Sequence, residues 1–271
     1  DGDVRGSRGF EGRIYLMAEN HEKHVGNVWV APLAALQFLT IAPPLIRRRF
    51  TAQEMGWSVG FFPLVGMLLG LVLAGLRWGL GYLLPPGVSA VLVLAAWVLM
   101  TGALHLDGFL DACDGLLGGH TPERRLEIMR DERMGAFGVI GGTLLLLLKY
   151  STMVTLEPIA GLVLVPMLGR WGMALAVVGF PYARTSGTGR VFKDYAGWRQ
   201  MALATAIVLP AAWIAARGMG LAGIVLTGIL VFALARFVLA RLPGLTGDVY
   251  GAICEAVEAS VLLLCVIWPG V

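Results

Sequence analysis

Long apolar segments constrain this chain more than any other feature of its sequence. A helix needs about 20 apolar residues to cross the roughly 30 Å hydrocarbon core of a bilayer. The chain offers eight candidates, at residues 28–46, 57–84, 87–104, 136–156, 159–181, 201–216, 219–240 and 252–270. Charged residues make up 14% of its 271 residues, against about 25% in a soluble domain. We therefore predict an all-α, polytopic integral membrane protein.

Proline residues interrupt some of these segments and leave the number of spans open. Pro43 and Pro44 close the first segment, and Pro63 and Pro166 lie within later ones. Since proline ends or kinks a helix, the first segment is expected to be a span or an interfacial, re-entrant helix. We predict about seven or eight transmembrane or re-entrant helices in a single membrane-embedded domain, residues 28–271.

The first 27 residues differ from the rest of the chain because they are polar. They contain no apolar core of signal-peptide length, so no cleavable secretory signal is visible. We expect this segment to be disordered. Because Met17 lies within it, we further expect residues 1–16 to be a leader or an added extension, with translation starting at Met17.

Basic residues gather in alternate loops between the apolar segments. Alternate threading of the segments places 13 of them on one side, at Arg47, Arg48, Arg49, Arg124, Arg125, Arg130, Arg133, Arg184, Arg190, Lys193, Arg199, Arg236 and Arg241. Only Arg77 and Arg217 fall in the opposite loops. The positive-inside rule makes the basic side cytoplasmic, which predicts a multi-pass protein of the cell (inner) membrane. The net charge of +3 needs no nucleic acid to explain it.

Three aspartates in the run 105–115 form the strongest candidate site. Asp107, Asp111 and Asp114 are spaced i, i+4 and i+7, so a helix places them within about 60° of one face. Like charges at a membrane boundary repel one another and are costly to desolvate. A divalent cation with oxygen ligands relieves both costs, and the two glycines in the run allow a bulky anion to approach. The run therefore predicts a magnesium–phosphate site.

Other acidic residues on the same predicted side are candidates to complete this site. Asp131 lies just before the chain re-enters the membrane, and Arg133 beside it can clamp a phosphate. Asp248 and Glu255 are spaced i, i+7, with Glu258 one turn further along. This second acidic helix end could supply part of a metal cage, as in two-metal phosphoryl-transfer sites.

Several cationic residues are candidates to bind phosphate. Lys149 and Arg170 lie inside predicted spans, where a charge is expected to snorkel or to pair with a carboxylate or a ligand phosphate. Arg184 and Arg190 lie in a glycine-rich loop suited to phosphate. His105 is open to three roles: a metal ligand, a substrate contact or a hydrogen-bonded packing residue.

Five motifs in collinear order resemble the cobalamin synthase family of membrane-bound ribazoletransferases. They are the runs 105–115 and 123–138, Pro181–Arg184, Thr246–Ala252 with the following glutamates, and Leu36–Thr40. The resemblance covers about residues 30–270. It implies the joining of adenosylcobinamide-GDP to α-ribazole or α-ribazole 5′-phosphate, with release of GMP and a requirement for Mg²⁺. Monomeric and homo-oligomeric states both remain open.

The resemblance also implies roles for the candidate residues. Metal binding is expected of Asp107, Asp111, Asp114 and Asp248, and catalysis is expected of these four and Asp131. The residues expected to bind the substrate phosphates are His105, Arg133, Lys149, Arg170, Arg184 and Arg190. Glu255 and Glu258 are expected to orient neighbouring groups. The active site is expected to face the cytoplasm, on the same side as the basic loops.

Two alternatives remain at this stage. A CDP-alcohol phosphotransferase also uses an aspartate cluster on membrane helices, but the continuation of that motif is absent after Asp114 and Gly115. A cation transporter uses carboxylates near mid-bilayer, whereas this cluster lies at a boundary beside many arginines. Three cysteines without C-x-x-C spacing indicate neither a zinc site nor a disulfide framework.

Overall fold

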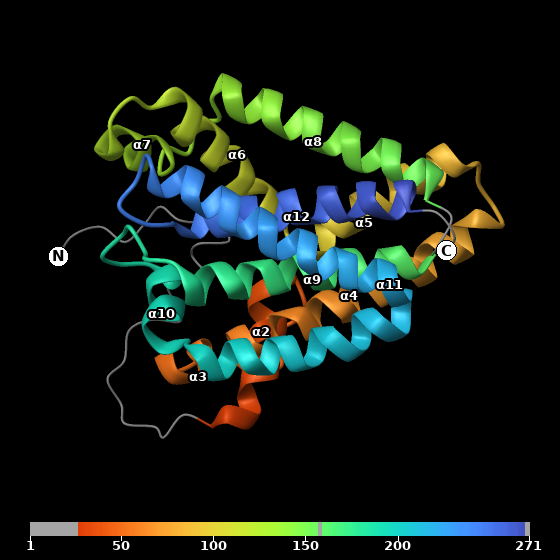
Figure 1. Cartoon of the computed structure of the whole chain (residues 1–271), viewed down its shortest axis with the longest axis horizontal. Helices are drawn as coiled ribbons and strands as arrows, with labels where there is room; N and C mark the ends of the chain where they lie inside the picture. Colours follow the sequence, from red (N-terminus) through yellow and green to blue (C-terminus); the bar gives the residue numbers. More distant parts are fainter. Residues whose placement is uncertain (1–26, 157–158, 269–271) are drawn as a thin grey trace.

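The computed structural model describes residues 27–156 and 159–268, and these residues form a bundle of helices (Figure 1). The predicted polar segment 1–27 lies outside the described residues except for Asn27. The helices are η1 (Val28–Val30), α2 (Ala31–Leu39), α3 (Ala52–Ser58), η2 (Val59–Phe61), α4 (Phe62–Gly81), α5 (Pro86–Met100), α6 (Leu104–Gly118), α7 (Pro122–Ile128), α8 (Ala136–Thr155), α9 (Ile159–Gly179), α10 (Thr188–Tyr195), α11 (Trp198–Leu239) and α12 (Gly247–Ile267). Among the described residues there is no β-strand, only an isolated bridge between Tyr182 and Leu245.

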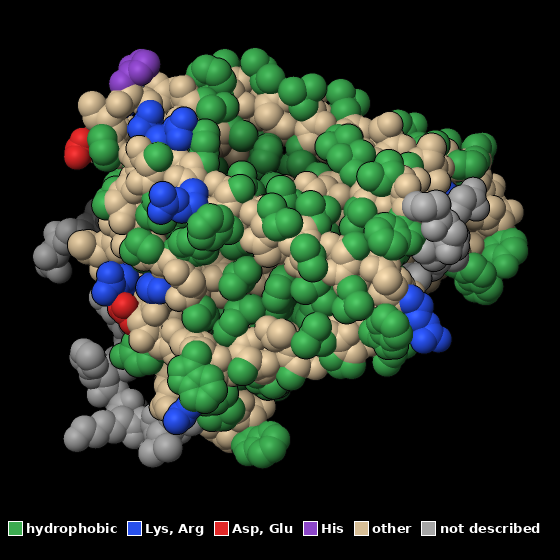
Figure 2. Space-filling model, viewed as in Figure 1, with side chains coloured by type: hydrophobic (Ala, Val, Ile, Leu, Met, Phe, Trp, Pro, Cys, Tyr) green, Lys and Arg blue, Asp and Glu red, His purple; other side chains and the backbone are tan. Residues whose placement is uncertain are grey.

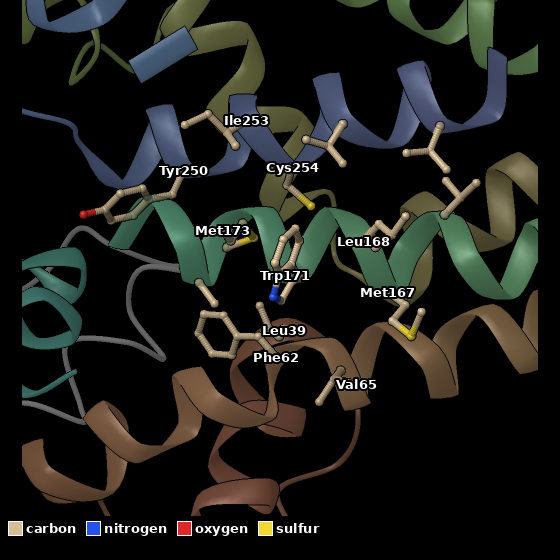
Figure 3. Close-up of a cluster of buried hydrophobic side chains, with 14 of the residues drawn as sticks. Leu39, Phe62, Val65, Met167, Leu168, Trp171, Met173, Tyr250, Ile253 and Cys254 are labelled. Atoms are coloured by element: carbon tan, nitrogen blue, oxygen red, sulfur yellow. The ribbon is translucent and has the colours of Figure 1, made fainter. Parts of the chain in front are cut away.

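Helix α9 is the centre of the bundle, with α4, α11 and α12 packed around it (Figure 1). Gly66 and Gly70 let α4 approach α9 closely, since a Cβ on Gly66 would lie 2.3 Å from the Pro166 carbonyl oxygen. Buried side chains of α4 and α12 meet α9 from opposite sides, as Phe62 and Ile253 do in Figure 3. The core is therefore continuous across the bundle, with α9 as its least exposed element.

Helix α11 is a hairpin of two antiparallel arms. The backbone leaves helical geometry at Ala216 and Arg217, where φ is −150° and 46°. Thr205 in the first arm accepts a hydrogen bond from the Trp171 indole, and Thr227 in the second arm packs beside the neighbouring Gly172. In a straight helix these two threonines would be about 33 Å apart, so the chain reverses at the break (Figure 1).

A second break separates α5 from α6. Gly102 and Ala103 have φ values of 59° and 58°, and the two helix axes meet at 87°. Ala103 pays the steric penalty of the left-handed region, which glycine avoids. The predicted span 87–104 thus ends at a sharp turn, and the aspartate run forms a separate helix.

Within the part of the chain that the structure describes, five helices are long and apolar enough to cross a membrane, or six when α5 and α6 count as one bent span. Counting the two arms of α11 separately gives seven, the lower predicted number. The expected span 28–46 was wrong as a continuous helix, because α2 ends at Leu39 and covers only nine residues. Pro43 and Pro44 keep the following segment non-helical.

Charged side chains gather at one end of the bundle. Figure 2 shows most of the basic side chains on that face at the end that carries α7 and α10, while hydrophobic side chains cover the length of the helices. Contacts join the loops of this end. The Arg125 guanidinium donates to the Arg241 carbonyl, and backbone hydrogen bonds link Leu245 to Pro181 and Ala183. The predicted basic loops therefore lie together, at the same end as the aspartate helix.

Candidate active site

Two glycines bring the aspartate helix α6 against the start of α12. A Cβ on Gly108 would lie 3.0 Å from the Asp248 Cα, and one on Gly251 would lie 3.0 Å from the His105 carbonyl oxygen. Any larger side chain at either position would push the helices apart. The close crossing places Asp107 and Asp248, which are 141 positions apart in the sequence, on the wall of one cavity.

This cavity has a volume of about 410 Å³ and lies between α2, α4, α6, α9, α10 and α12. Its polar wall includes Asp107, Asp248 and Arg184. The remaining lining includes the apolar side chains Phe38, Phe62, Met173, Val177 and Phe192, together with His105, Tyr182, Tyr250 and residues 186–189 of the glycine-rich turn. The turn passes through Gly187 with φ 102°, a conformation that favours glycine.

Arg184 holds Asp248 in the cavity wall. Its Nη2 atom donates to Asp248 Oδ2 at 2.7 Å, and the Thr246 hydroxyl donates to the same oxygen at 3.2 Å. Thr246 is also the N-cap of α12, since its hydroxyl accepts from the Val249 N–H. The loop bearing Arg184 is tied to the α12 side by the Tyr182–Leu245 bridge. This pairing unites two motifs that the sequence placed separately.

Asp107 and Asp111 are the unpaired carboxylates of the aspartate helix. Neither makes a hydrogen bond or an ion pair with any residue that the structure describes. Asp107 is exposed, lines the cavity and lies near Asp248. Asp111 is half-buried, and the negative charges of Asp107 and Asp248 act on it. Their oxygen atoms are thus free to bind a ligand.

Asp114 has a different environment from the other two aspartates. Its carboxylate accepts hydrogen bonds from the backbone N–H groups of Gly135 and Gly138, at 2.7 and 2.8 Å. These donors belong to the first turn of α8, whose N-terminal N–H groups have no partners within the helix. Asp114 is buried and caps α8, a role that the spacing of the aspartates did not predict. It does not line the cavity.

No group of three or more acidic, histidine or cysteine side chains is arranged as a ready metal cage within residues 27–156 and 159–268. The predicted four-aspartate ligand set is therefore not assembled around one point. Asp107, Asp111 and Asp248 remain close to one another, whereas Asp114 is turned toward α8.

The predicted phosphate contacts Lys149 and Arg170 form a buried ion network instead. Lys149 Nζ lies 2.5 Å from an oxygen of Glu255 and 2.5 Å from an oxygen of Glu258. Arg170 pairs with the other oxygen of Glu258 and contacts His105 Nδ1 at 3.3 Å. Buried charges persist when paired in this way. Of the alternatives that the sequence left open, the structure shows pairing with carboxylates, and it places both cations outside the cavity lining.

Asp131, Arg133 and Arg190 lie on the surface, away from the cavity lining. Arg133 pairs with Asp131 at 3.0 Å, and this hydrogen bond lowers the pKa of the Asp131 carboxyl group. Arg190 pairs with Asp194 one turn along α10 at 2.8 Å. The structure does not bring these three predicted site residues to the carboxylates of α6 and α12.

Several cavity residues were missed by the sequence argument. Phe38, Phe62 and Phe192 come from three separate helices. Phe38 lies in the Leu36–Thr40 motif, but a phenylalanine side chain gives no chemical signal of a site. Tyr182 and Tyr250 stack in the wall with ring centroids 5.9 Å apart. Burial raises the pKa of the Tyr182 phenol, which keeps it protonated. Tyr182 belongs to the Pro181–Arg184 motif and Tyr250 to the Thr246–Ala252 motif, and these motifs offered the available signal.

The fold and the cavity together define a polytopic α-helical membrane protein with paired carboxylate and guanidinium groups at its charged end. Comparison with known proteins is more specific. The family model described as cobalamin-5-phosphate synthase matches residues 31–266, and the chain belongs to this family. The sequence-based resemblance is thereby confirmed.

Curated relatives share the same name. An adenosylcobinamide-GDP ribazoletransferase of Geotalea daltonii is 40% identical over 238 residues, which cover 87% of this chain and 96% of that protein. Proteins of the same name from Desulforamulus reducens and a Roseiflexus species are 39% and 37% identical, over 85% and 86% of this chain and 93% and 90% of their own lengths. No solved structure matches the chain.

Proposed function

We infer that this chain is an adenosylcobinamide-GDP ribazoletransferase that completes the assembly of cobalamin. Membership of the family supports the activity, and relatives of that name match nearly the whole chain. The observation that carries the location of the site is the cavity where Asp107 meets the Asp248–Arg184 pair.

The reaction requires a hydroxyl group of α-ribazole, or of its 5′-phosphate, to attack a phosphorus atom of adenosylcobinamide-GDP. We propose that attack occurs at the phosphorus that stays with the corrinoid, so the P–O–P bond breaks and GMP leaves with the bridging oxygen. The proton of the attacking hydroxyl passes to a base, a role that one carboxylate of the site can take while the others hold the metal. Arg184 can stabilise negative charge on the phosphoryl oxygens.

We propose that Mg²⁺ supports this reaction, held by Asp107 and Asp111 with Asp248 nearby. Mg²⁺ in phosphoryl-transfer sites commonly takes one or two carboxylates together with substrate phosphates and water. The free oxygens of Asp107 and Asp111 fit that donor set, although no cage of three protein ligands is formed among the described residues. The ion would neutralise charge on the pyrophosphate. Asp114 is excluded from this set because its oxygens cap α8.

We further propose that the site faces the cytoplasm, in a protein of the cell inner membrane. The positive-inside rule supports this orientation, because the cavity lining includes Arg184 and residues 186–189 of a predicted basic loop. The apolar outer surface of the long helices is expected to contact the lipid bilayer.

The test is turnover by the purified chain in detergent or nanodiscs. Adenosylcobinamide-GDP and α-ribazole 5′-phosphate are added with Mg²⁺, and release of GMP is followed by chromatography. We expect GMP and the joined corrinoid in equal amounts, and loss of both with Asp107→Asn. Absence of turnover by a folded, Mg²⁺-supplied wild-type chain would refute the proposed activity.

A further inference from the structure

The cavity has two walls of different chemistry. Asp107 on α6, Asp248 on α12 and Arg184 in the loop between α9 and α10 form the polar wall. Phe38 on α2 and Phe62 on α4 belong to the apolar wall. In Figure 3, Phe62 lies on the α4 side of α9 while Tyr250 lies on the α12 side. A ligand that fills this space thus meets hydrocarbon from one set of helices and charge from another.

The apolar wall is a preformed aromatic corner. Phe38 and Phe62 are nearly parallel, with centroids 6.2 Å apart and planes at 17°. Phe192 points its edge at both rings, at 4.8 and 5.5 Å. Phe62 and Phe192 are buried, but Phe38 is only half-buried although it lies inside the bundle. The three rings therefore form an apolar corner of the cavity lining, of the kind against which a planar aromatic ring packs well.

The size of the cavity selects between the two substrates of the proposed reaction. About 410 Å³ lies within the range of roughly 300–1,000 Å³ typical of small-molecule sites. A nucleoside, with one bicyclic base and one ribose, is of this scale. A corrinoid carrying a nucleotide is several times larger, so its macrocycle must remain outside.

The chemistry of the aromatic corner selects between the two bases that could enter. Guanine, on the GDP part of the other substrate, carries several N–H donors and a carbonyl that need partners. An unpaired polar group in such surroundings costs about 1–3 kcal/mol. The neighbouring lining at Met173 and Val177 is also apolar. The benzimidazole base of α-ribazole has no N–H donor, so it loses little on burial there.

We propose that this cavity is the α-ribazole site, with the base packed against Phe38, Phe62 and Phe192 and the ribose directed at Asp107 and Arg184. The inference rests on the proposed function, because that function supplies the two candidate substrates. It places the attacking hydroxyl at the carboxylate wall. The corrinoid phosphate then approaches the same wall from outside the cavity.

Phe38 offers the sharpest test because it is half-buried and its loss leaves the aromatic pair of Phe62 and Phe192 in place. Binding of α-ribazole 5′-phosphate and of GMP is measured separately by calorimetry with wild type, Phe38→Ala and Phe38→Leu. Phe232→Ala is the matched control, since Phe232 is 61% exposed on the outer face of α11. Each variant is checked by its elution profile and thermal unfolding.

We expect Phe38→Ala to weaken binding of α-ribazole 5′-phosphate about tenfold, equivalent to about 1.4 kcal/mol, within the range seen when a stacking ring is removed. Phe38→Leu should cause a smaller loss, and GMP binding should change less than twofold. A loss confined to GMP, or unchanged binding of both ligands, would overturn the assignment. Wild-type turnover is scored separately, so failure of the assignment is distinct from failure of the proposed function.

A second experiment needs no substitution and decides the matter if Phe38→Ala does not fold. An α-ribazole analogue with a photoreactive group on the benzimidazole ring is cross-linked to the wild-type chain, and labelled peptides are identified by mass spectrometry. We expect label on α2, α4, α9 or α10, with protection by unlabelled α-ribazole. Label confined to α6 and α12 would reverse the proposed orientation and refute it.

Discussion

Replacement of Asp114 separates the capping role seen in the structure from the metal role expected from the sequence. Asp114→Ala removes two hydrogen bonds from backbone N–H groups to a buried carboxylate. Bonds to a charged group contribute about 1.5–3 kcal/mol each. The two bonds together amount to about 3–6 kcal/mol, so we expect a loss of at least about 3 kcal/mol, and about half of that for Asp114→Asn, which retains one acceptor oxygen. For a chain of this size, 3 kcal/mol corresponds to a fall in Tm of about 6–12 °C.

The assay is thermal unfolding of the purified protein in one detergent, with Asp107→Ala as the control. Asp107 makes no hydrogen bond with a described residue, so its replacement should leave Tm nearly unchanged while turnover is lost. In the folded fraction of Asp114→Asn, the half-saturating Mg²⁺ concentration should match that of wild type. An unchanged Tm together with a tenfold rise in that concentration would show that Asp114 is a metal ligand and that the capping argument fails.

Three further predictions concern other parts of the molecule. Lys149→Met should destabilise the protein by about 3–5 kcal/mol, because it leaves buried carboxylates without their cation. Partial recovery of Tm in the double variant with Glu258→Gln would confirm the cause. A wild-type Tm for Lys149→Met would contradict it. Turnover by Asp107→Asn should fall at least 100-fold with its Tm retained, and near-normal GMP release would remove Asp107 from the mechanism. Single cysteines at Arg125 and Arg190, on a background without native cysteines, should both react with an impermeant maleimide from the cytoplasmic side, whereas labelling from opposite sides would break the proposed topology.

The helical pattern was largely predictable because long apolar segments have few alternatives in a membrane. Local chemistry likewise sets the start of α7, where the Thr121 hydroxyl accepts a hydrogen bond from the Arg124 N–H and Pro122 is the first helical residue. The two breaks were also placed within about two residues, since the predicted segments 201–216 and 219–240 separate beside Ala216 and Arg217, and segment 87–104 ends beside Ala103. Their backbone geometry was not predicted. Ala103 and Arg217 adopt positive φ without being glycine, so tertiary packing rather than local preference fixes these turns.

The candidate site was predicted in part. The shared face of Asp107 and Asp111 and the convergence of Asp248 follow from helical spacing and from the side on which the motifs fall. The sequence did not predict which basic residues line the cavity and which belong to the buried ion network. It does not show that Arg170 lies beside Glu258 or that Arg184 lies beside Asp248. Arg184 was correctly placed with the site, whereas Arg133 and Arg190 have local partners that any exposed helix or turn provides.

The buried ion network gives a physical reason for the position of the site. Glu258 on α12 binds both Lys149 on α8 and Arg170 on α9, and Arg170 contacts His105 at the start of α6. Two carboxylates and two cations leave the network neutral, so it persists in an apolar interior where a single unpaired charge would not. A shift of α6 or α12 along its axis would separate these partners. Each buried charge would then lack a counter-ion, and its desolvation free energy would destabilise the fold. The network therefore restricts the sliding of the two helices that carry Asp107 and Asp248, and the glycine contacts between them set how closely they approach. The carboxylates at the cavity wall are held in register by charges that never reach the substrate.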